Sequence, residues 1–168
     1  MIYIFEMTDI LVKKVISGGQ TGVDRAALDF ASKCGLDCGG WCPKGRLALD
    51  GRIADKYPLQ ETPSASYSQR TKWNVKDSDG TLIISRGVLN GGTALTNRLA
   101  KQYDKPCLIM DLDYVEMKRD AALGMLLSWL AEHSIKTLNI AGPREREKRG
   151  IYSETLGFLV EFWEEVTL

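Results

Sequence analysis

The chain is poor in the residues that most metal sites and nucleic-acid binders need. Its 168 residues include one histidine, His133, which excludes a multi-histidine metal site. Lysine and arginine total 22, and aspartate and glutamate also total 22, so no net charge favours nucleic acid. No apolar run approaches the ~20 residues that cross a bilayer, so no membrane partner is expected. The start, Met1-Ile2-Tyr3-Ile4-Phe5, lacks the basic residues of a signal peptide, and we expect a cytoplasmic protein.

Cysteine is also scarce, and its spacing is unlike that of common metal sites. Cys34, Cys38 and Cys42 are separated by three residues each, whereas familiar zinc and iron–sulfur patterns use two-residue spacings. We therefore predict buried structural thiols and no metal site. The alternative is a thiol beside a soft metal, for which Cys42 is the best candidate because it precedes Pro43 at a strand end.

Apolar segments with strand character alternate with helical ones along the chain. Strands are expected at 12–17, 38–42, 80–85, 106–110 and 137–141, and helices at 22–34, 91–103, 117–133 and 152–166. This alternation predicts an α/β fold with a doubly wound, mainly parallel sheet of about five or more strands, Rossmann-like, in a single domain over 1–168. Residues 1–11 are a possible extra segment, and 43–70 is expected to be a long functional loop, such as a lid.

A glycine-rich turn, Gly18-Gly19-Gln20-Thr21-Gly22, joins the first strand to the first helix. Such a turn directs backbone N–H groups and the positive end of the helix dipole at one point, which favours phosphate. Thr21 and Asp24 have capping-box spacing, so we expect Thr21 to accept the N–H of Asp24. The turn matches neither the dinucleotide fingerprint nor the Walker A pattern.

A second glycine turn, Gly91-Gly92-Thr93, opens the helix after the 80–85 strand, and Arg144 follows a Gly-Pro turn after the last strand. The carboxyl ends of parallel strands lie at one sheet edge, where α/β proteins bind ligands. The predicted site for a phosphorylated small molecule comprises Gly18, Gly19, Gln20, Thr21, Gly22, Gly91, Gly92, Thr93 and Arg144.

Several blocks in order resemble the molybdenum carrier proteins. These are the glycine-rich turn with its flanks and the segments 42–46, 57–62, 70–79, 91–93 and 141–144. That family is similar to a wider Rossmann-like superfamily that includes the lonely-guy phosphoribohydrolases, once labelled lysine decarboxylases. The resemblance implies a homo-oligomer that carries a phosphorylated ligand, molybdenum cofactor, at its glycine loops.

The resemblance to the hydrolases is incomplete at the second glycine turn. Their motif places a catalytic glutamate shortly after Gly-Thr, whereas here Ala94-Leu95-Thr96-Asn97 follows Thr93. If the protein were an enzyme, Glu61 or Asp24 would have to act as acid or base, although Asp24 is expected to cap its helix. We expect binding without turnover; the alternatives are a nucleotide-processing hydrolase and a noncatalytic nucleotide sensor.

Overall fold

The computed structural model describes residues 12–168, and the possible extra segment 1–11 lies outside this range. Five strands form one sheet in the order β2-β1-β9-β7-β8, and every neighbouring pair is parallel. They are β1 (Lys14–Ile16), β2 (Asp37–Gly39), β7 (Gly80–Ser85), β8 (Cys107–Asp111) and β9 (Thr137–Ala141). The predicted parallel α/β sheet is thereby confirmed, with β7 and β9 at their expected bounds.

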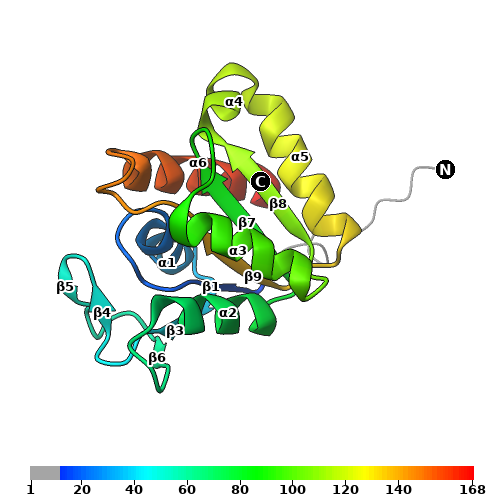
Figure 1. Cartoon of the computed structure of the whole chain (residues 1–168). Helices are drawn as coiled ribbons and strands as arrows, with labels where there is room; N and C mark the ends of the chain where they lie inside the picture. The colour runs from blue at the N-terminus through cyan, green and yellow to red at the C-terminus, as the bar shows by residue number, and fades with distance from the viewer. Residues whose placement is uncertain (1–11) are drawn as a thin grey trace.

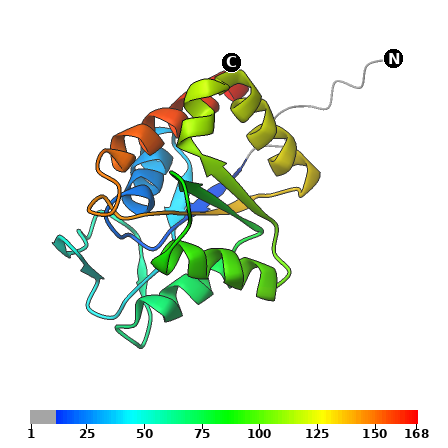
Figure 2. The same cartoon turned by 45° about the horizontal axis from the view of Figure 1, so that its top comes forward.

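Helices cover both faces of this sheet (Figures 1 and 2). One face carries α1 (Val23–Lys33), the short α4 (Leu112–Met117), α5 (Arg119–Glu132) and α6 (Ile151–Thr167). The other carries α2 (Tyr67–Asp77) and α3 (Gly91–Gln102), which pack side by side. All six residues of β7 are buried as a result, which explains why its sequence, Gly-Thr-Leu-Ile-Ile-Ser, contains no charged residue.

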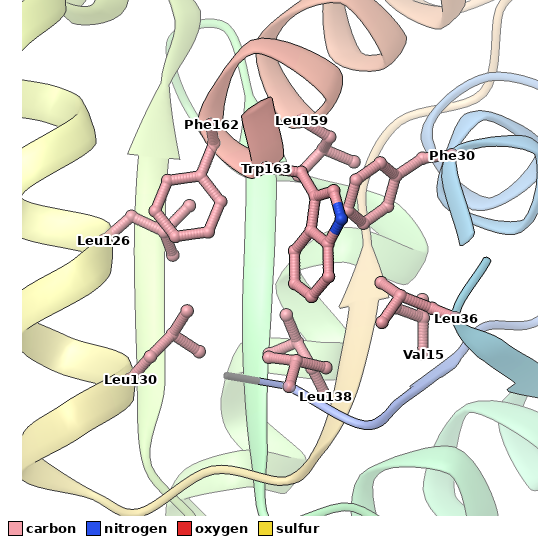
Figure 3. A pocket seen from close by; sticks show the side chains of 10 residues that line it. Val15, Phe30, Leu36, Leu126, Leu130, Leu138, Leu159, Phe162 and Trp163 are labelled. Carbon is pink, nitrogen blue, oxygen red and sulfur yellow. The ribbon is translucent and has the colours of Figure 1, made fainter. Parts of the chain in front are cut away.

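The main core lies between the sheet and α1, α5 and α6 (Figure 3). Phe30 of α1 meets Trp163 of α6 edge to face, with ring centroids 6.3 Å apart. A gap of about 10 Å³ remains here, and every residue around it is apolar. A space of this size without polar groups does not hold water, so it is a packing gap and not a ligand site.

The strand order is that of a Rossmann sheet with its first strand moved to the end of the chain. If β9 is counted first, the order β2-β1-β9-β7-β8 becomes 3-2-1-4-5, the dinucleotide-binding arrangement. The last strand in sequence is therefore the central strand in space. The switch point lies between β9 and β7, and the loops after β1, β7 and β9 meet there.

One expected strand is wrong and one helix was not expected, because glycine and polar residues interrupt the pattern. The strand expected at 38–42 breaks at Gly40, whose φ of 123° favours glycine and which lies against the Ser17 backbone. β3 (Trp41–Cys42) leaves the sheet and pairs with β6 (Gln60–Glu61). Helix α2 was not expected at all, because two of its three buried residues, Thr71 and Asn74, are polar and hide the helical period.

The helix expected at 117–133 is also wrong at its start. The chain forms two helices, α4 and α5, which meet at Lys118, where φ is −140°. Asp111 caps α4 by accepting the N–H of Asp113 at 2.8 Å. The last residue of β8 thus caps a helix that begins where a loop was expected.

Residues 43–62 form a small subdomain rather than an open loop. It contains the hairpin of β4 (Leu47–Ala48) and β5 (Gly51–Arg52), together with β6. The Arg46 guanidinium is buried and donates to four backbone carbonyls, those of Ile53, Ala54, Tyr57 and Leu59. These four bonds hold the segments of the subdomain to one another, whereas its contact with α1 is apolar, because Ile53, Tyr57 and Leu59 pack in one cluster with Leu28.

Candidate anion-binding site

A cleft of about 60 Å³ lies at the switch point of the sheet, where the sequence predicts a ligand. Four parts of the chain line it: the loop after β1 with the start of α1, α2, the start of α3, and the loop after β9. The principal lining residues are Gln20, Asp24, Tyr67, Arg70, Gly92, Thr93, Gly142, Arg144 and Glu147. The cleft therefore unites residues from both glycine turns with Arg144.

Gln20 contributes a buried amide group whose orientation is fixed by the backbone. Its Oε1 accepts the N–H of Thr21 at 3.0 Å and that of Leu49 at 2.9 Å. Its Nε2 is buried and meets no acceptor among residues 12–168. Because a buried donor without a partner loses its solvation, this NH₂ is available for an incoming acceptor.

Arg70 is the second buried donor, and Asp24 holds it in place. Arg70 Nη1 lies 2.9 Å from Asp24 Oδ2, and the Arg70 side chain is 12% exposed. Its Nε is buried and lacks an acceptor in the described part of the chain. Burial raises the pKa of Asp24, against the opposing effect of the Arg70 charge. Gly18 is needed here because a Cβ would overlap the Arg70 guanidinium.

The N-terminus of α3 faces the same cleft and is open. Ala94 N–H donates to the Asn90 carbonyl, and Asn90 makes no side-chain cap. The N–H groups of Gly91, Gly92 and Thr93 have no acceptor among the residues that the structure describes. Three free donors and the positive end of the helix dipole therefore point outward at this position.

Arg144 completes the positive lining together with Tyr67. The Arg144 guanidinium lies 5.1 Å from the Tyr67 ring centroid, and that of Arg70 lies 5.8 Å away. The tyrosine ring thus keeps both cations at the cleft through cation–π contacts. Glu147 accepts the N–H of Arg144 at 3.3 Å, which orders the loop after β9.

The first glycine turn is arranged differently from expectation. The capping prediction is wrong: the cap of α1 is Gly22, with no side-chain bond, and Thr21 lines a separate cavity. Asp24 does not cap the helix either, since its carboxylate binds Arg70 and the Gln20 N–H. The N–H of Val23 donates to the Pro143 carbonyl, so one of the N–H donors at the start of α1 already has an acceptor within the protein.

Gly19 and Gly22 serve packing more than ligand approach. Both have positive φ, 75° and 86°. A Cβ on Gly19 would meet Leu59 and Ile53 of the 43–62 subdomain, and one on Gly22 would lie 2.4 Å from the Pro143 oxygen. The first turn therefore contributes to the cleft through Gln20, whereas α3 supplies the open helix terminus.

The two carboxylates considered for catalysis are not brought together. Glu61 is exposed on β6, and its carboxylate accepts the N–H of Gly45. It does not line the cleft, whereas Asp24 lies buried within it. The lid expected from 43–70 is replaced by the subdomain beside α1, and only its end, the start of α2, reaches the cleft.

Tyr67 and Arg70 are functional candidates that sequence reasoning did not select. Both belong to α2, the helix without apolar periodicity. The signal in the sequence was Arg70 itself, which lies in a block shared with the molybdenum carriers. A helix face that is both buried and polar often indicates a site, and α2 has such a face with Thr71 and Asn74. The face can be recognised in the sequence only after the helix itself has been recognised.

The thiols have structural surroundings. Cys42 is buried in the subdomain core, Cys34 and Cys38 pack against the main core, and burial raises the pKa of all three. Within residues 12–168 no three histidine, cysteine or acidic side chains cluster as metal ligands would. Trp41 and Trp73 pack edge to face, with ring centroids 4.6 Å apart, so the edge of one ring lies against the face of the other.

The fold is that of a Rossmann-like α/β protein, and the candidate cleft lies at the switch point of its parallel sheet. The chain belongs to the circularly permutated YpsA SLOG family, whose model matches residues 15–163. This permutation agrees with the position of β9. In the part of the chain that the structure describes, no helix is long and apolar enough to cross a membrane.

One solved structure is similar over most of the chain. It is the crystal structure, at 1.45 Å resolution, of a "putative molybdenum carrier protein" from Syntrophus aciditrophicus SB. The two sequences are 54% identical, the match covers 90% of this chain and 94% of the other, and the TM-score is 0.86. The resemblance to the molybdenum carriers is therefore confirmed. No curated protein matches this chain.

Proposed function

We propose that this protein binds a phosphorylated small molecule in the switch-point cleft and carries it without turnover. The observation that supports this is a pair of buried donors beside an open helix terminus, Gln20 Nε2 and Arg70 Nε, for which residues 12–168 provide no acceptor. Each unpaired buried donor costs about 1–3 kcal/mol. A phosphate offers several acceptor oxygens and would satisfy both donors at once.

The ligand that we propose is molybdenum cofactor, a pterin that bears a phosphate and a metal-binding dithiolene. The similar solved structure is named as a molybdenum carrier. The donor set fits the phosphate: Gln20, Arg70, Arg144 and the N–H groups of Gly92 and Thr93 would hold it. The cofactor's own chemistry is molybdenum redox transfer, and the role of this chain is to bind and protect the group. We also propose that it does so as a homo-oligomer in the cytoplasm.

Titration calorimetry with inorganic phosphate tests the anion site. Arg144→Ala removes a cleft cation and should weaken phosphate binding about tenfold or more, because a hydrogen bond to a charged group contributes ~1.5–3 kcal/mol. Arg146→Ala is the matched control, since Arg146 is exposed in the same loop and does not line the cleft. Equal affinities for these two variants would show that the site is misplaced.

Gln20→Glu provides a second variant that spares the loop. The glutamate keeps an oxygen for the N–H groups of Thr21 and Leu49 but replaces the NH₂ donor with a negative oxygen. We expect phosphate binding to be lost, and we expect a lower melting temperature because the new carboxylate is buried beside Asp24, so binding is compared at a temperature where melting shows the variant to be folded. Retained binding would contradict the assignment of Gln20 Nε2.

The identity of the ligand is tested on protein purified without oxygen. Native mass spectrometry with elemental analysis should find a phosphorylated pterin together with molybdenum. A bound nucleotide would instead support one of the two nucleotide-based alternatives.

A further inference from the structure

Thr93 and Glu147 line two cavities, not one. Beyond the inner cleft of about 60 Å³ lies an outer cavity of about 410 Å³, to which Ser85, Val88, Gly91 and Lys148 contribute. Gly91 faces the outer space and Gly92 the inner one. The N-terminus of α3 therefore lies at the junction of the two.

The two cavities differ in burial. The inner wall is formed by Gln20 and Asp24, each 3% exposed, and by Thr71, which is 7% exposed. The outer cavity also has buried residues, Ser85 and Thr93, but Val88 at its rim is 86% exposed. A ligand group that reaches the inner wall therefore meets buried side chains, and an organic group attached to it would extend past Thr93 into the outer cavity.

The inner cleft and the outer cavity also differ in the ligand groups that their linings suit. The inner cleft holds the unpartnered donors and is too small for a ring, whereas the outer cavity falls in the size range of small-molecule sites, ~300–1,000 Å³. The outer lining mixes the aliphatic Val88, the hydroxyl of Ser85 and the cation of Lys148. Such a lining suits an organic group with both apolar faces and polar edges.

We infer that the protein selects phosphate monoesters. The terminal phosphate would lie in the inner cleft, and an organic group with one heterocyclic ring system, fused rings included, would lie in the outer cavity. This inference rests on the proposed function, since it presumes that the inner cleft binds phosphate. A phosphodiester is disfavoured because its phosphorus carries organic groups on two sides, and the inner side is closed by Gln20, Asp24 and Arg70.

Four probes test the selection by titration calorimetry: inorganic phosphate, guanosine, guanosine 5′-monophosphate and guanosine 3′,5′-cyclic monophosphate. Guanine shares its amino-pyrimidinone edge with a pterin, so it is a suitable outer group. The 5′-monophosphate should bind at least about tenfold more tightly than each of the other three. A cyclic diester that binds as well as the monoester would overturn the inference, as would a monoester no tighter than phosphate.

Variants that fill the outer cavity separate its role from that of the inner cleft. Ser85→Val and Val88→Trp add bulk from two different positions and should each weaken the monoester about tenfold while leaving inorganic phosphate unchanged. Ser153→Val is the matched control, because Ser153 lines a different cavity. Thermal melting identifies a variant that fails to fold, and Val88→Trp is at an exposed position where folding should persist.

The two proposals fail in distinguishable ways. Absence of binding by both inorganic phosphate and the monoester refutes the proposed phosphate site itself. Phosphate binding that depends on Arg144, combined with a monoester affinity insensitive to Ser85→Val and Val88→Trp, refutes only the monoester inference.

Discussion

Substitution of Gly92 by alanine separates the stability of the fold from binding at the site. Gly92 is the second residue of α3, its φ is not positive, and a Cβ built on it meets no atom within 4 Å. Alanine should therefore be accommodated without strain. Because alanine has less conformational freedom in the unfolded chain, the free energy of unfolding should rise by ~0.4–1 kcal/mol.

The gain should appear as a higher melting temperature. For a chain of this size, 1 kcal/mol corresponds to about 2–4 °C, so Gly92→Ala should melt ~1–4 °C higher. Anion binding should change in the opposite direction. A methyl group beside the Gly92 N–H keeps the anion from its closest approach, and loss of one such hydrogen bond, ~1.5–3 kcal/mol, weakens binding about tenfold or more.

Gly124→Ala is the matched control for this experiment. Gly124 is an exposed glycine inside α5, it also has open space around its Cβ, and it does not line the cleft. Its replacement should raise the melting temperature by ~2–4 °C, because glycine in a helix interior costs about 1 kcal/mol relative to alanine. Phosphate affinity, measured by calorimetry, should stay at the parent value. Unchanged affinity in Gly92→Ala as well would refute the role of the α3 terminus.

Three further predictions concern other parts of the molecule. Arg46→Lys cannot reproduce four hydrogen bonds to carbonyls, so urea denaturation should show a loss of at least about 3 kcal/mol, and an unchanged midpoint would contradict the role of Arg46. Burial raises the pKa of Cys107 to about 11, so its labelling by iodoacetamide at pH 8 should be ~100-fold slower than that of a thiol at the reference pKa of 9.0, and should speed up steadily toward pH 11. Incubation with nucleoside mono- and triphosphates should release base or phosphate at well below about one turnover per second, because one turnover per second already lies within the usual range for enzymes. Faster release would establish an enzyme, and the variants Glu61→Gln and Asp24→Asn would then identify its acid or base.

The sequence predicts well those elements whose residues all lie in the same surroundings, either buried or exposed. β7 is buried on both faces and contains Leu82, Ile83 and Ile84 with no charged residue, and its bounds agree with expectation. Helix α2 escapes prediction because two of the three residues on its buried face are polar. Thr71 lines the cleft, and Asn74 bonds the backbone N–H and carbonyl of Trp41. Polar contacts on a buried face thus remove the apolar periodicity on which the recognition of a helix depends.

The site shows the same limit at the level of single groups. The glycine turns could be placed at one sheet edge from the strand–helix alternation alone. The sequence could not predict which N–H groups stay free, because that depends on contacts between distant segments. The Pro143 carbonyl takes the Val23 N–H, and Gln20 Oε1 takes that of Leu49. Arg70 reaches Asp24 across 46 positions of sequence.

The central position of β9 has a consequence for how the chain is made. Strands β1 and β7 both pair with β9 and not with each other, so the halves β2-β1 and β7-β8 have no shared ladder without it. On the ribosome, where domains generally fold as the N-terminal parts emerge, β9 arrives after the other four strands of the sheet. Until then each half exposes an unpaired inner edge, a template for mispairing. The nascent protein should therefore depend on chaperones until β9 has emerged, and truncation before 137 should yield aggregates rather than a smaller folded sheet.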